Sequence, residues 1–179
     1  KNAAMDGIVQ THIFDWRNET WSRGPNMAAE RWYPSLAALG NDEAVIVGGG
    51  PSVPEFYQTD GSLRLLTNAS GYSAREYPFL STRPDGQVQL LGPPTGMYTI
   101  NTSGTGALSA VQQRDTINRD YGSFATYDIG KVLVVGGGDV TEGGQPHVPT
   151  KTAKIVDFNG GTPEVGAAGE CGLDYFRNF

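Results

Sequence analysis

The chain has 179 residues, including 25 glycines and 11 prolines, and its formal net charge at pH 7 is −6. Charged residues make up 18% of the chain, and no segment shows the long, capped pattern of a helix, so the composition favours an all-β protein. The negative charge argues against nucleic acid or an anionic membrane as a partner, since both bind basic surfaces, and no apolar run is long enough to span a bilayer.

The first predicted elements are two strands within residues 8–22. We expect them to be the outer pair of a sheet whose inner strands would precede Lys1. Residues 1–6 lack the apolar core of a signal peptide, so the chain is expected either to be processed already or to begin within a longer protein. His12 lies in this outer pair and does not converge with His147, so neither histidine is predicted to bind a metal.

Residues 31–66 contain four predicted strands. An Arg-x-Tyr strand from Tyr33 to Leu39 leads through a turn at residues 40–42 into an apolar strand that ends in Gly48-Gly49. The uniformly apolar character of this second strand predicts that both of its faces are buried. The outer pair, residues 55–57 and 63–66, is more amphipathic.

The same pattern recurs in residues 75–110 and 119–168. Tyr33, Tyr77 and Tyr121 lie 44 residues apart, and so do the arginines before them and the glycines that end the second strands, Arg31, Arg75 and Arg119 and Gly48, Gly92 and Gly136. Strand-rich repeats of about 40–50 residues are typical of β-propeller blades, and a Gly-Gly after the second strand is typical of the kelch kind. We therefore predict an all-β fold, a partial kelch-type β-propeller with four-stranded antiparallel blades.

The two ends complete the predicted organisation. The third repeat carries an additional loop between Asp139 and Thr150, which either borders a substrate entrance or is a solvated turn. The whole chain, 1–179, is predicted to be part of one propeller domain, with the outer half of a blade in 1–22, three blades in 31–66, 75–110 and 119–168, and the start of another in 176–179. Because a propeller closes as a ring, we expect a piece of a longer protein; the alternative is a small open sheet complete in itself.

Two further features concern the cell compartment. Three N-x-[ST] sequons, at Asn18, Asn68 and Asn101, favour an extracellular, secreted glycoprotein. The single cysteine, Cys171, excludes an internal disulfide and is expected to be a buried or incidental thiol.

The repeat motifs resemble those of the copper radical oxidases, the galactose oxidase and glyoxal oxidase-like proteins. The resemblance is carried by Arg31-Trp32-Tyr33-Pro34-Ser35, by residues 77–79 with 84–86, and by residues 119–123 with 130–138. It implies a copper cofactor on the propeller axis, held by two tyrosines and two histidines, and the oxidation of a small aldehyde, primary alcohol or sugar by dioxygen with release of hydrogen peroxide. Oxygen and imidazole donors suit Cu(II) at such a site.

Tyr33 matches the family tyrosine that is cross-linked to a cysteine and carries the radical, so the resemblance implies that Tyr33 is both catalytic and a metal ligand. The cysteine would lie one blade upstream, before Lys1, and the remaining tyrosine and histidines would lie after Phe179, in the rest of the propeller. The chain alone is therefore expected to be inactive. Galactose oxidase has a tryptophan after the Gly-Gly of this blade, whereas Gly48–Gly50 here runs into Pro51, which argues against galactose as substrate.

Other interpretations stay open. Tyr77 and Tyr121 occupy the same position in their repeats, so Tyr33 is alternatively a structural aromatic residue. The protein is alternatively a non-catalytic kelch propeller that binds carbohydrate or protein, or a truncated product without function. The recurring arginines, which include Arg177, are predicted to be structural and to bind carbonyls or carboxylates of the next blade with their five donors.

Overall fold

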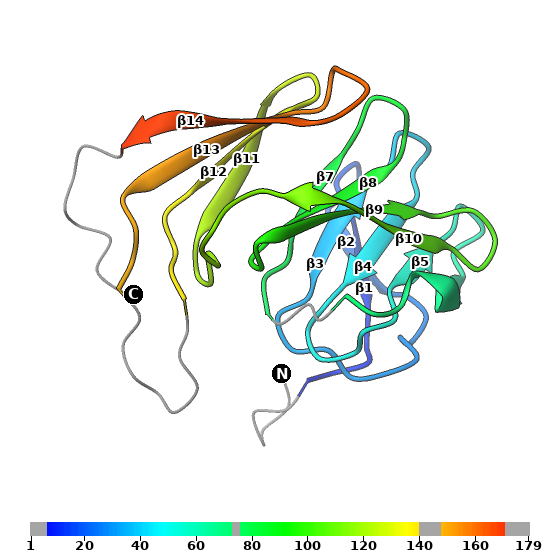
Figure 1. Ribbon diagram of the computed structural model, residues 1–179. Helices are drawn as coiled ribbons and strands as arrows, with labels where there is room; N and C mark the ends of the chain where they lie inside the picture. Colours follow the sequence, from blue (N-terminus) through cyan, green and yellow to red (C-terminus); the bar gives the residue numbers. More distant parts are fainter. Residues whose placement is uncertain (1–6, 73–75, 140–147, 171–179) are drawn as a thin grey trace. The chain divides into compact units, whose positions relative to one another are not determined.

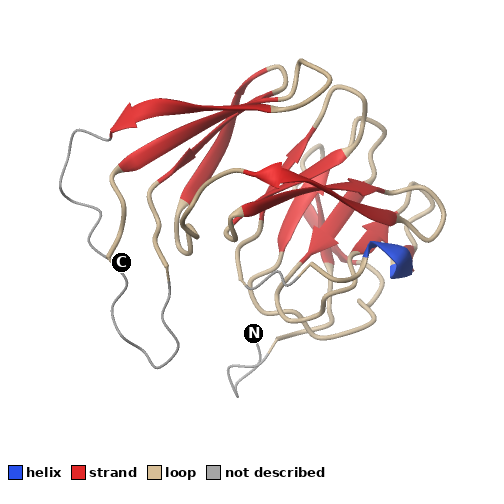
Figure 2. Ribbon diagram, viewed as in Figure 1, coloured by secondary structure: helices blue, strands red, loops and turns tan. Residues whose placement is uncertain are grey.

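A computed structural model describes residues 7–72, 76–139 and 148–170. The described residues form β-strands and one short 3₁₀ helix, η1 (Thr67–Ala69), as Figure 2 shows. The strands, labelled in Figure 1, are β1 (His12–Asp15), β2 (Thr20–Arg23), β3 (Ser35–Ala38), β4 (Ala44–Val47), β5 (Glu55–Tyr57), β6 (Leu63–Leu65), β7 (Phe79–Thr82), β8 (Val88–Gly92), β9 (Gly96–Asn101), β10 (Ala107–Gln113), β11 (Ser123–Asp128), β12 (Lys131–Val135), β13 (Thr152–Asp157) and β14 (Glu164–Glu170). No helix in the described part of the chain is long and apolar enough to cross a membrane.

The strands pair in chain order. They form a two-stranded sheet, β1-β2, and three four-stranded sheets, β3-β4-β5-β6, β10-β9-β8-β7 and β11-β12-β13-β14. The sheets are antiparallel, so the predicted all-β fold of four-stranded antiparallel blades is confirmed. Short turns join the first and second strands of each four-stranded sheet in chain order, and antiparallel neighbours need no long crossover.

The turns predicted between the first and second strands are present in all three repeats. The Leu39 amide donates to the Glu43 carbonyl at 2.8 Å, and the Arg83 amide donates to the Gln87 carbonyl at the same distance. Asp42, Gly86 and Gly130 take positive φ angles of 64°, 80° and 68° there. Asp and Gly tolerate this left-handed backbone better than other residues, which explains why the sequence places them at these turns.

The chain divides into two compact units, Lys1–Tyr77 with Asn101–Leu108, and Pro78–Ile100 with Ser109–Phe179. In the first unit the core strand β4 buries Val45, Ile46 and Val47. In the second unit every residue of β8 is buried, and the core cluster is formed by Phe79, Leu91, Met97, Val132, Val134, Val156 and Phe158. The apolar second strands thus supply the centre of each unit's core.

The predicted boundary of the first strand needs a correction. The strand was expected to begin at Tyr33, but β3 begins at Ser35, and β7 and β11 likewise begin two residues after Tyr77 and Tyr121. Each tyrosine has a positive φ, 52° at Tyr33, which is incompatible with extended strand backbone. The Arg-x-Tyr motif is therefore a turn that precedes the strand.

Candidate functional site

Tyr33 lies in a left-handed turn at the entrance to β3. Tyr77 and Tyr121 take nearly the same conformation, with φ angles of 54° and 58° against 52° at Tyr33. All three side chains are partly exposed, by 43% at Tyr33, 40% at Tyr77 and 64% at Tyr121. A left-handed backbone at a residue with a Cβ costs roughly 1–2 kcal/mol, so the surrounding structure must impose it.

Hydrogen bonds hold the backbone on both sides of Tyr33. The Trp32 amide donates to the Gly49 carbonyl at 2.8 Å, and the Tyr33 carbonyl accepts from the Tyr77 amide at 2.9 Å. Both bonds join residues of the first unit. The phenol of Tyr33 is thereby presented from a fixed backbone.

Arg31, two residues before Tyr33, is buried in a cage of oxygen atoms. Its Nη1 donates to the Gly48 carbonyl at 2.8 Å and its Nη2 to the Val53 carbonyl at 2.7 Å. Its Nε and Nη2 both donate to Glu55 Oε1, at 3.2 and 3.0 Å, and the two side chains are only 1% and 2% exposed. The other oxygen of Glu55 accepts from the Ala28 amide at 2.8 Å. Arg31 therefore ties the turn of Tyr33 to the second and third strands of its sheet.

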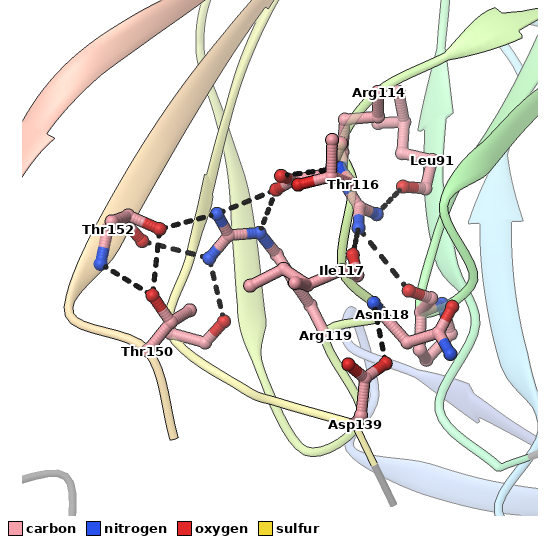
Figure 3. A network of polar contacts seen from close by, with 12 residues as sticks. Leu91, Arg114, Thr116, Ile117, Asn118, Arg119, Asp139, Thr150 and Thr152 are labelled. Carbon is pink, nitrogen blue, oxygen red and sulfur yellow. Dashed lines mark hydrogen bonds and ion pairs between the residues drawn. The ribbon is translucent and has the colours of Figure 1, made fainter. Parts of the chain in front are cut away.

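Arg119 makes the equivalent cage in the second unit, as Figure 3 shows. Its Nη1 donates to the Gly136 and Thr152 carbonyls, both at 2.8 Å, and its Nη2 donates to Thr152 Oγ1 at 2.9 Å. Its Nε donates to Asp115 Oδ2 at 2.8 Å. Gly136 follows Arg119 by the same interval as Gly48 follows Arg31, and Thr152, like Glu55, opens the third strand.

These cages correct the prediction about the arginines. They were expected to bind the next blade, but Arg31 and Arg119 bind glycine carbonyls and third-strand residues of their own repeats. The physical reason is that β3-β4-β5 pair in order, so the end of the second strand and the start of the third lie next to the residue that precedes the first. Arg75 and Arg177 lie outside the described residues.

A further buried arginine, Arg114, belongs to the same network. It donates to the carbonyls of Leu91, Pro93 and Ile117, close to Arg119 in Figure 3. The repeat did not predict Arg114, because it lies outside the Arg-x-Tyr motif and only the tertiary structure shows where its side chain lies.

The second glycine of the Gly-Gly pair packs closely against the backbone of this turn, which leaves no room for a side chain. A methyl group at Gly49 would lie 2.8 Å from the Trp32 carbonyl oxygen and 2.9 Å from the Trp32 nitrogen, and one at Gly137 would lie 2.6 Å from the Arg119 carbonyl oxygen. Real Cβ atoms do not approach backbone so closely. The Arg-x-Tyr and Gly-Gly halves of the repeat motif are therefore two sides of one packed turn.

Replacing Gly49 by alanine should destabilise the first unit by about 2–4 kcal/mol, because the new Cβ meets backbone at Trp32 and φ is +76°. Gly40→Ala is the matched control, since a Cβ there meets nothing within 4 Å, and its effect should stay below about 1 kcal/mol. Urea unfolding followed by tryptophan fluorescence measures both, because Trp16, Trp21 and Trp32 all belong to the first unit. Equal midpoints for the two variants would contradict the packed turn.

Two aromatic rings contact Tyr33. The Tyr77 ring stacks on it with centroids 4.7 Å apart and an interplanar angle of 25°, and the Trp32 ring meets it edge-on at 4.5 Å and 63°. The Tyr77 ring therefore covers one face of the Tyr33 ring, although this chain has no tryptophan directly after its Gly-Gly. Sequence reasoning missed this stack, although the 44-residue interval already paired Tyr33 with Tyr77.

Tyr33 is the only residue of this chain that the sequence predicts as a metal ligand. Among the described residues no group of three or more His, Cys, Asp and Glu side chains could hold a metal ion. His12 is an exposed residue of β1. His147, Cys171 and most of the loop between Asp139 and Thr150 lie outside the described residues.

Comparisons with known proteins support the fold. No protein-family model matches the chain, and no curated protein matches it. Among solved structures the chain is similar to a novel fungal alcohol oxidase of the AA5 family, described as having catalytic diversity and solved in complex with copper, with a TM-score of 0.78 and 22% identity. The match covers 94% of this chain but 38% of the oxidase, so the chain spans less than half the length of its structural relative. The chain thus has the fold of a partial β-propeller.

Proposed function

We propose that the protein containing this chain is a secreted copper radical oxidase of the kelch-propeller kind. It oxidises a small primary alcohol or aldehyde, or a sugar alcohol group, and passes the two electrons and two protons to dioxygen, which becomes hydrogen peroxide. The observation that carries the proposal is the Arg-Trp-Tyr-Pro-Ser turn at Tyr33 in a chain that shares the fold of a copper-bound alcohol oxidase.

Tyr33 is the proposed copper ligand and radical site. Its phenol is 43% exposed, and the left-handed turn holds its backbone through the Trp32 and Tyr77 hydrogen bonds. A phenol oxygen on a partly exposed residue with a fixed backbone is a suitable donor for Cu(II), which accepts oxygen and nitrogen ligands. The fit is that of one donor, because the described part of the chain holds no group of three or more His, Cys, Asp and Glu side chains that could complete a metal site.

The residues around Tyr33 prepare it for this role. Tyr33 would hold the copper, which would supply one-electron redox chemistry, and the oxidised Tyr33 phenol would take the second of the two substrate electrons. The Tyr77 ring shields one face of the Tyr33 ring from water, and Trp32 contacts its edge. The buried ion pair of Arg31 and Glu55 fixes the turn that carries Tyr33. Positioning of this kind reduces the entropy that is lost when the reactants reach the transition state.

The 179-residue chain by itself should neither retain stoichiometric copper nor release peroxide, because it supplies one of the four proposed ligands. Metal analysis after dialysis against a weak chelator and a peroxide assay with primary alcohols and aldehydes measure the two properties. One copper per chain together with peroxide release would contradict this prediction.

The wider proposal is tested on the gene that encodes the chain and its flanks. A cysteine one blade upstream, and a tyrosine, a histidine and a second histidine in later blades, are expected. Their absence would favour the second candidate function, a non-catalytic propeller that binds carbohydrate or protein. The observation that supports this candidate is the same left-handed turn at Tyr121, because a turn that recurs in another repeat can be purely structural and needs no copper.

A further inference from the structure

The hairpin that joins β1 and β2 has a defined loop. Asp15 pairs with Thr20, which leaves a four-residue loop at residues 16–19. Glu19 takes a left-handed φ of 56°, and Asn18 Oδ1 accepts from the Thr20 amide at 3.1 Å and from Thr20 Oγ1 at 2.6 Å. The asparagine and the threonine of one sequon are thus held together, with the Asn18 side chain in an exposed turn.

Trp16 stands on the same loop, two residues before Asn18. Its side chain is 74% exposed, among the highest values for a large apolar residue in the described chain, and the Arg17 guanidinium lies 5.7 Å from its ring centroid. Consecutive Cα atoms are 3.8 Å apart, so the Cα atoms of Trp16 and Asn18 are at most about 7.6 Å apart. An exposed indole within this distance has no role in the core, but it lies within reach of a sugar ring attached to Asn18.

We propose that Asn18 is an N-glycosylation site and that the first sugar packs its apolar face against the Trp16 indole. Asn18 Nδ2 forms a bond to C1 of N-acetylglucosamine, the bond from C1 to the phosphate of a polyprenyl-diphosphate oligosaccharide breaks, and Nδ2 loses one proton as polyprenyl diphosphate leaves. The C–H groups of a sugar face are weakly positive and match the negative face of an aromatic ring. This assignment rests on the proposed secretion and is independent of the oxidase activity.

Neither of the other two sequons has an aromatic residue two positions before its asparagine. Asn68 lies in η1, its Nδ2 donates to Thr105 Oγ1 at 2.9 Å, and the following Ala69 is fully buried. Asn101 ends β9, and its Oδ1 accepts from the Ser103 amide at 2.8 Å. The residues two positions before them are Leu66, which is buried, and Thr99. Trp16 is therefore the only aromatic residue at this position in the three sequons.

The test compares the same chain made with and without glycosylation. The chain is secreted from a eukaryotic host, its glycans are trimmed enzymatically to one sugar, and glycopeptide mass mapping gives the occupancy of each sequon. Thermal unfolding is compared with the chain made in a bacterium, in the wild type, in W16A and in W21A. Trp21 is the matched control, because it is 70% exposed on the same hairpin but lies outside the sequon.

We expect Asn18 to be occupied and the sugar to raise Tm by about 2–4 °C, the shift that one weak contact gives in a domain of this size. W16A should abolish this shift, and W21A should preserve it. An unmodified Asn18, or a shift that persists in W16A, would overturn the proposal. A native protein found only inside its cells would instead refute secretion, and a glycosylated but inactive full-length protein would refute only the oxidase.

Discussion

Glu55→Gln is expected to destabilise the first unit by about 3–5 kcal/mol, because it leaves the Arg31 guanidinium buried without a counter-charge. Both Arg31 and Glu55 are almost completely inaccessible to solvent, and Glu55 also holds the Ala28 amide. A domain is stable by only about 5–15 kcal/mol, so a loss of this size shifts the urea midpoint strongly. Tryptophan fluorescence during urea unfolding measures it, since the tryptophans belong to the first unit.

Glu170→Gln, in the second unit, is the control for this prediction, and far-ultraviolet circular dichroism follows its unfolding in urea because the tryptophans lie in the first unit. Glu170 pairs with Lys151 at 2.8 Å, closer than the 3.0 Å between Arg31 and Glu55, but its side chain is 58% exposed. Exposed pairs contribute about 0–1 kcal/mol, because water and salt screen them. A similar loss in both variants, or a negligible loss in Glu55→Gln, would show that the Arg31 cage does not stabilise the turn of Tyr33.

Tyr33→Phe is expected to reduce peroxide release by the full-length protein at least about 10³-fold, equivalent to about 4 kcal/mol of activation free energy. The substitution removes the phenol oxygen, and with it the proposed ligand and the oxidisable group, but keeps the ring that stacks on Tyr77. Steady-state peroxide assays give the rate, and electron paramagnetic resonance of the oxidised protein reports the loss of the tyrosyl radical.

Tyr121→Phe separates the catalytic interpretation of Tyr33 from a structural one. Tyr121 occupies the same left-handed position, with φ 58° against 52°, but it has no counterpart in the proposed copper site. We expect this variant to retain the activity and the radical signal. Equal losses in the two variants would assign Tyr33 a structural role, and full activity in Tyr33→Phe would remove it from the chemistry altogether.

The sequence by itself determined the repeat and hence the fold class. The sequence shows apolar strand patterns, turn residues such as Gly86 and a 44-residue repeat interval. Strands and turns can be predicted from such patterns because they depend on the local preferences of the backbone. The same patterns gave the hairpins and outer strand pairs at nearly their observed positions. For the candidate site, the motif alone singled out Tyr33; its assignment to copper remains a proposal.

Only the tertiary structure decided how the motif residues act together. It showed that Tyr33 lies in a left-handed turn before β3, and that Arg31 binds its own sheet through Gly48 and Glu55. It also brought the Tyr77 ring onto Tyr33. A positive φ at a tyrosine contradicts the local preference of that residue, so no propensity predicts it. The cage and the close approach at Gly49 arise from the pairing of consecutive strands in one sheet, and the ring stack arises where two repeats meet. Sequence spacing alone does not give these side-chain contacts.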